Sequence, residues 1–176
     1  MPILSKNLIF TGLFSAAIIG CSGAETPASQ SDDIVEVPLN EVPQNISDVV
    51  AAMSPDFKMA EVLKKRREGR TYFDVEGELP NGEEIEFDVL MTDAGPKIVE
   101  IQRDIAWTAV PKSARKLVRA ANTEKQKIVR VIESQQADTD MIIYEIFVEG
   151  YPSKPRFEAS ITGGAPAKLL DTPWKH

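Results

Sequence analysis

The 176-residue sequence contains one cysteine, Cys21, and one histidine, His176, and this shortage limits the chemistry that the chain can perform. A Ser-His-Asp or Cys-His arrangement needs a histidine beside its nucleophile, and a His/Cys zinc site needs several such ligands. The chain also lacks a glycine-rich phosphate loop. We therefore expect no enzyme, no metal site and no cofactor, although paired carboxylates could still act as an acid and a base.

The chain also lacks an apolar run of about 20 residues, the length that spans a bilayer. The apolar stretch from Leu8 to Ile19 is shorter and follows Lys6, which is typical of a secretory signal peptide. The formal net charge of −7 argues against nucleic acid as a partner, because such binding needs clustered positive charge.

The sequence IIGC at residues 18 to 21 resembles the lipobox of bacterial lipoproteins. The resemblance implies cleavage before Cys21 and attachment of lipid to it, which would hold the protein firmly on a membrane. We predict a signal peptide over residues 1–20 and a flexible tether over 21–33. Because Ser22 is not aspartate, the expected location in a Gram-negative host is the periplasmic face of the outer membrane.

The remainder of the chain contains an internal repeat, which appears when Val42-Pro43 is aligned with Val110-Pro111. Apolar residues at i, i+3, i+4 and i+7 then predict one amphipathic helix in each copy. These residues are Ile46, Val49, Val50 and Met53 in the first copy and Ala114, Leu117, Val118 and Ala121 in the second.

Similar spacing predicts a second helix in each copy, beginning at Ser54 and at Thr123. Its apolar stripes are Met59, Val62 and Leu63, and then Ile128, Val131 and Ile132. Three strands follow each helical pair. We therefore expect an α+β fold of two repeats, 34–106 and 107–176, each helix-helix-strand-strand-strand, with the helices packed on one face of an antiparallel sheet.

Residues 72 to 91, YFDVEGELPNGEEIEFDVLM, predict a hairpin with carboxylates on one face. Only a loop with an odd number of residues keeps the apolar residues of both strands together, so we expect the three-residue loop Pro80-Asn81-Gly82 with Gly82 left-handed. This register places carboxylates opposite one another as Asp74 with Asp88, Glu76 with Glu86, and Glu78 with Glu84.

The first copy resembles a PepSY-like repeat in its opening Val-Pro, its YFDVEG strand, its NGEEIEFDV strand and its GPKIVEI strand. The second copy is looser, since a Tyr-Pro-Ser-Lys segment replaces the Asn-Gly turn. Tandem PepSY-like proteins resemble the β-lactamase-inhibitor protein in fold. The resemblance implies a secreted, non-catalytic module that inhibits or binds another protein through an open sheet face.

The opposed carboxylates repel one another, and two explanations remain open. Solvent and salt could screen them, helped by Lys97, Arg103, Lys154 or Arg156. A basic partner protein could instead bind there, with Tyr72 and an exposed Phe147 adding apolar contact. The predicted partner-binding residues are Tyr72, Asp74, Glu76, Glu78, Glu84, Glu86 and Asp88.

We therefore expect a lipid-anchored protein of the cell envelope that binds or inhibits another envelope protein. The alternative is an accessory protein that binds a cation or a small ligand, although no EF-hand spacing is present. Two tryptophans are also open to two interpretations. Trp107 suits core packing better than recognition, and Trp174 either docks on the sheet or frays with the terminus.

Overall fold

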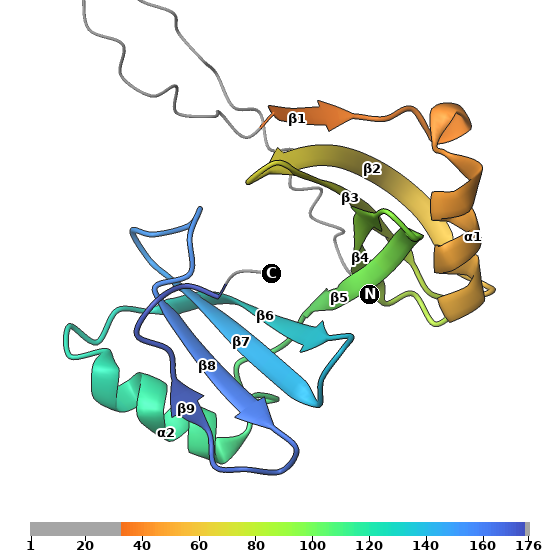
Figure 1. Cartoon of the computed structure of the whole chain (residues 1–176). Coiled ribbons are helices and arrows are strands. Elements are labelled where there is room, and N and C mark those ends of the chain that lie inside the picture. The colour runs from red at the N-terminus through yellow and green to blue at the C-terminus, as the bar shows by residue number, and fades with distance from the viewer. Residues whose placement is uncertain (1–32, 175–176) are drawn as a thin grey trace, which may run out of the picture. The chain divides into compact units, whose positions relative to one another are not determined.

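The structure, a computed structural model, describes residues 33–174. All helices and strands of this part lie within one compact unit, Ser31–His176. Nine antiparallel strands form one sheet in which the order of the strands follows the chain (Figure 1).

Each copy of the repeat consists of one helix followed by four strands (Figure 1). The first copy is preceded by β1 (Asp33–Glu36) and the 3-10 helix η1 (Leu39–Glu41). It contains α1 (Gln44–Met53), β2 (Lys58–Arg67), β3 (Arg70–Glu78), β4 (Glu84–Thr92) and β5 (Gly95–Asp104). The second copy contains α2 (Lys112–Ala121), β6 (Ile128–Gln136), β7 (Met141–Val148), β8 (Phe157–Thr162) and β9 (Lys168–Leu169).

The predicted fold class, two helix-helix-strand-strand-strand repeats, is wrong. The segments predicted as the second helices are the strands β2 and β6, so each copy has one helix and four strands. Ser54 does not begin a helix but follows the last residue of α1, and its amide donates a 2.8 Å hydrogen bond to the Val50 carbonyl. Thr123 lies in the loop that precedes β6.

A β-bulge in each of these strands explains the wrong prediction. In a regular strand residues i and i+3 point to opposite faces, but one extra residue between them puts both on the same face. The register of β2 shifts between Met59 and Glu61, and that of β6 shifts between Ile128 and Arg130. Met59 and Val62 therefore pack in one hydrophobic core although they are three residues apart, which imitates the spacing of a helix.

The predicted first helix of each copy is confirmed, and equivalent residues are buried in both. Ile46 and Val50 of α1 belong to the first hydrophobic core, and Ala114 and Val118 of α2 belong to the second. Each helix follows a proline, Pro43 or Pro111, whose missing amide hydrogen costs little at a helix start. Val49 is only half-buried, and Met53 is 53% exposed, so the apolar stripe of α1 is narrower than its spacing predicts.

The register predicted for the 72–91 hairpin is confirmed. Val75 pairs with Phe87, and each of the three carboxylate pairs stands as expected: Asp74 with Asp88, Glu76 with Glu86 and Glu78 with Glu84. In the three-residue loop the Gly82 amide donates a 2.9 Å hydrogen bond to the Leu79 carbonyl. Gly82 has φ +81°, the left-handed conformation that a residue without a side chain adopts at little cost.

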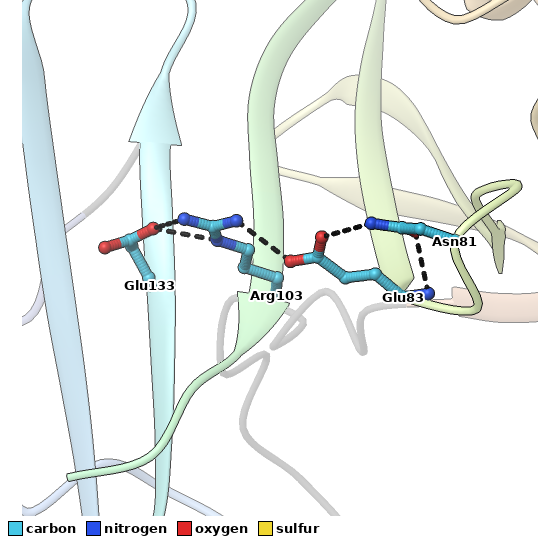
Figure 2. A network of polar contacts seen from close by, with 4 residues as sticks. All are labelled: Asn81, Glu83, Arg103 and Glu133. Carbon is cyan, nitrogen blue, oxygen red and sulfur yellow. Dashed lines mark hydrogen bonds and ion pairs between the residues drawn. The ribbon is translucent and has the colours of Figure 1, made fainter. Parts of the chain in front are cut away.

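The two copies are joined through the pairing of β5 with β6. Arg103 of β5 donates two hydrogen bonds of 2.9 and 2.7 Å to Glu133 of β6 and one of 2.9 Å to Glu83, the residue before β4 (Figure 2). Asn81 donates to Glu83 at 3.4 Å and accepts from the Glu83 amide at 3.1 Å. These bonds to carboxylates, those to Glu133 first, raise the pKa of Arg103, so one guanidinium links the hairpin loop to the second copy.

Within residues 33–174, neither helix has the length and hydropathy required to span a bilayer.

Candidate binding site on the sheet

The predicted carboxylates lie on the face of the sheet that points away from α1. Successive side chains of a strand point to opposite faces. Phe73 and Val75 of β3 and Phe87 of β4 belong to the same hydrophobic core as two α1 residues, so the intervening acidic residues point the other way. We call the set Asp74, Glu76, Glu78, Glu84, Glu86 and Asp88 the acidic ladder.

Burial changes along the acidic ladder. The pair Glu78 and Glu84 nearest the loop is exposed, and Glu76 is also exposed. Asp74 and Asp88, in contrast, are only 4% and 9% exposed. The ladder therefore runs from solvent at the loop end to a buried carboxylate pair further along the two strands.

Glu100 of β5 extends the ladder across a third strand and was not predicted. It pairs with Asp88 and is 2% exposed. A bulge between β4 and β5 explains the omission: Asp88 pairs with Glu100 but Val89 pairs with Ile98. Simple alternation puts Glu100 on the same face as Ile98, in the core, whereas the extra residue moves it to the opposite face. The spacing of Ile98 and Ile101, which both pack with the core, carries the only sequence signal of this bulge.

Three carboxyl groups meet at the buried end. One oxygen each from Asp74, Glu86 and Asp88 lies within 4.8 Å of the others. Burial, the charge of Asp88 and hydrogen bonds with Asp88 and Glu76 raise the pKa of Glu86 to about 10. Burial also raises the pKa of Asp88, to about 6. At neutral pH the protonated carboxyl of Glu86 thus donates a hydrogen bond to the Asp88 carboxylate, because two adjacent buried carboxyls share a proton rather than both ionise.

Lys65 is the basic residue that reaches this cluster, through an ion pair with Asp74. Other basic residues that were expected to screen the acidic ladder contact residues outside it. Lys97 pairs with Asp138, and Arg103 pairs with Glu133 and Glu83. Arg156 lies 5.2 Å from the ring centre of Tyr151. Lys65 also lowers the pKa of Glu86 and of Asp88, so its positive charge acts on all three carboxyl groups of the cluster.

A polar network continues this face into the second copy. Gln136 donates hydrogen bonds of 2.8 Å to Glu100 and to the Ser134 hydroxyl. The indole of Trp174 donates a 3.1 Å bond to the side chain of Gln136, and the Trp174 amide donates a 2.7 Å bond to Glu158. Trp174 therefore docks on the sheet, the first of the two interpretations left open, and it remains 40% exposed.

The two aromatic residues expected to offer apolar contact are buried. Tyr72 is 4% exposed and Phe147 is 6% exposed, so the prediction of an exposed Phe147 is wrong. Arg67 and Arg70 lie 5.9 and 5.5 Å from the ring centre of Tyr72. Arginine side chains stack on aromatic rings in this way and cover them, which leaves charged rather than apolar surface.

The other tryptophan, Trp107, is half-buried and packs against the second hydrophobic core, in agreement with the structural interpretation. Cys21, the predicted signal peptide and almost all of the tether lie outside the described residues, as does His176. The lysine- and arginine-rich run at residues 64–67 lies in β2.

A comparison with protein-family models, curated proteins and solved structures finds no match for the chain. The resemblance to PepSY-like repeats therefore stays a prediction.

Proposed function

We propose that the chain is a non-catalytic protein of the cell envelope that binds a basic segment of another envelope protein through the acidic ladder. The observation that carries this proposal is the set of three exposed carboxylates, Glu76, Glu78 and Glu84, at the solvent end of the ladder. No ion pair among the described residues involves any of them.

Electrostatic repulsion supports a partner of positive charge. Like charges directly opposite across strands destabilise a sheet by up to about 1 kcal/mol per pair. Glu78 and Glu84 form such an exposed pair. Lysine or arginine side chains of a partner would relieve this repulsion, and the complementary potentials would also accelerate association at low salt.

Charge reversal of the exposed carboxylates tests this function. A chain with Glu76→Lys, Glu78→Lys and Glu84→Lys should lose a partner that the wild type captures from envelope extract at low salt. A matched control changes three exposed acids away from the ladder, Glu41, Asp56 and Glu124, to lysine and gives the same change in net charge. The control should keep the partner. Identical partner profiles for all three proteins would refute the role of the ladder.

The membrane part of the proposal is supported by the sequence around Cys21, which resembles a lipobox. The lipid would hold the folded part at the envelope surface, on the periplasmic face of the outer membrane in a Gram-negative host. In cells, Cys21→Ser should move the protein out of the lipid-modified fraction, as measured by incorporation of a labelled fatty acid. Equal labelling of both chains would remove the anchor from the proposal.

A second candidate function is the binding of a divalent cation, and the buried end of the ladder favours it. Carboxylate oxygens from Asp74, Glu86 and Asp88 lie within 4.8 Å of one another, and oxygen ligands suit calcium. Calcium should then raise the melting temperature of the wild type but not that of an Asp88→Asn chain. Equal melting curves with calcium and with a chelator would remove this candidate.

A further inference from the structure

The exposed side of α2 carries a stripe of four basic residues. Lys112, Arg115, Lys116 and Arg119 are spaced i, i+3, i+4 and i+7, which places them on one side of the helix. They line a shallow surface hollow of about 340 Å³ whose lining includes no acidic residue. We call these four residues the basic stripe.

The repeat provides an internal comparison that shows the stripe is not required by the fold. The equivalent positions in α1, 68 residues earlier, are Gln44, Ser47, Asp48 and Ala51, none of which is basic. Both helices nevertheless bury the same two positions in their cores. Like charges at i and i+4 destabilise a helix by about 0.2–0.5 kcal/mol per pair, and α2 has two such pairs. The positive charge is therefore a feature that α2 adds at a small cost in stability.

The basic stripe has no anionic partner within the described part of the chain. None of the ion pairs between residues 33 and 174 involves its four members. The Nε atom of Arg115 is buried and has no hydrogen-bond acceptor. A buried donor without an acceptor is costly, so nothing within the described residues compensates this part of the stripe.

A second hollow extends the positive surface and adds an aromatic residue. It has a volume of about 470 Å³, and its lining includes Trp107, Arg119 and Lys125. Arg119 lines both hollows, so they lie next to each other. Tryptophan beside lysine and arginine is typical of the surface that proteins present to lipid headgroups.

We propose that the basic stripe and Trp107 dock the folded part on an anionic phospholipid surface. The stripe is about 10 Å long, since a helix rises about 1.5 Å per residue, so it can contact several headgroups at once. The apolar side of α2 is occupied, because Ala114 and Val118 are fully buried in the core. The helix therefore lies on the headgroups without inserting, and its binding is electrostatic and sensitive to salt.

Vesicle binding tests this proposal separately from the acidic ladder and from the lipid anchor. The full chain carries Cys21→Ser in every sample, so acylation contributes nothing and any effect of the N-terminal apolar run is common to all. The probe is phosphatidylcholine vesicles with and without phosphatidylglycerol. The test chain has Lys112→Gln, Lys116→Gln and Arg119→Gln. The control has Lys58→Gln, Lys64→Gln and Arg66→Gln, three exposed cations of β2.

Affinity for the anionic vesicles should fall by about tenfold or more in the test chain, because each basic residue near an anionic surface contributes substantially to binding. The control should change by less than about threefold, and wild-type binding should weaken as salt rises. An equal loss in both chains would overturn the proposal. So would equal wild-type binding to vesicles without phosphatidylglycerol, or complete displacement by inorganic phosphate at constant ionic strength, which would indicate a site for free phosphate.

Discussion

The carboxyl groups of Glu86 and Asp88 form the part of the acidic ladder whose protonation responds most to burial. Burial raises the pKa of both, and Lys65 lowers it, since a nearby positive charge favours the ionised form. A cation from a partner would act in the same direction as Lys65. Binding at this end of the ladder would therefore release protons, and its affinity would rise with pH.

Replacing Glu86 by glutamine should stabilise the protein, and the gain should depend on pH. The pKa of Glu86 is about 10 in the folded chain and about 4.3 when unfolded. The protonated carboxyl of Glu86 therefore contributes its full stabilisation below about pH 4. This stabilisation declines as the pH rises towards 10, because Glu86 ionises in the unfolded chain while it is still protonated in the folded chain. Glu86→Gln removes this decline while its amide can still donate to Asp88. We expect its melting temperature to exceed that of the wild type by about 3 °C or more at pH 8.

The rise in melting temperature caused by Glu86→Gln should shrink to nearly nothing at pH 4. The control Glu84→Gln changes an exposed residue of the same strand, and its effect on the melting temperature should not depend on pH in this way. Melting curves followed by circular dichroism at the two pH values provide the measurement. A Glu86→Gln chain that melts below the wild type at pH 8 would mean that Glu86 is ionised in the folded protein.

At this scale the sequence predicted which residues of the hairpin share a face but not how deeply each is buried. Alternation and the odd loop length sufficed for the six members of the ladder. Nothing local distinguishes buried Asp74 from exposed Glu78. Both pair with residues of β2, and the contact that sets Asp74 apart is its ion pair with Lys65, which comes from that other strand. The burial of Tyr72 likewise depends on two arginines, Arg70 at the start of its own strand and Arg67 at the end of β2.

At the scale of elements, β-bulges account for the main error of prediction. The apolar pattern in β2 and β6 fits a helix because each strand contains one extra residue. The pairing that makes this residue a bulge comes from another part of the chain, so the pattern alone cannot reveal it. The helices α1 and α2 were predicted correctly because their spacing and their preceding prolines are local signals.

Gly77 should be the most sensitive glycine of β3 and its hairpin, because it lies opposite the bulged part of β2. A Cβ atom at Gly77 would lie 2.1 Å from the Lys58 carbonyl oxygen and 2.5 Å from Cζ of Phe57. The backbone of β2 would have to shift. We expect Gly77→Ala to lower the free energy of unfolding by about 2 kcal/mol or more.

Gly82→Ala provides the comparison for Gly77→Ala. Open space surrounds Gly82, so only its positive φ opposes a side chain, at about 1 kcal/mol. Urea unfolding of both variants measures the difference. A Gly77→Ala chain as stable as Gly82→Ala would show that β2 does not approach β3 as closely as described.

At the scale of the whole molecule, one repeated unit carries two different charged surfaces. The first copy presents the acidic ladder on β3 and β4, and the second presents the basic stripe on α2. Neither surface is repeated in full in the other copy. The helix α1 lacks the basic residues. The second copy keeps one acidic pair, Glu145 opposite Glu158, but Phe147 stands where Glu76 stands in the first copy. The duplication was predictable from sequence because the buried helix positions recur 68 residues apart. The same alignment of the two copies shows that their charged surface residues differ.

Site-specific photo-crosslinking in intact cells tests the central claim, that the acidic ladder binds a basic protein, most directly. A photoreactive residue at position 84 should form an adduct with one protein, and the same residue at the exposed position 51 of α1 should not. The adduct at position 84 should disappear when Glu76 and Glu78 are changed to lysine. An adduct that persists after those changes, or the same adducts from both positions, would contradict the account.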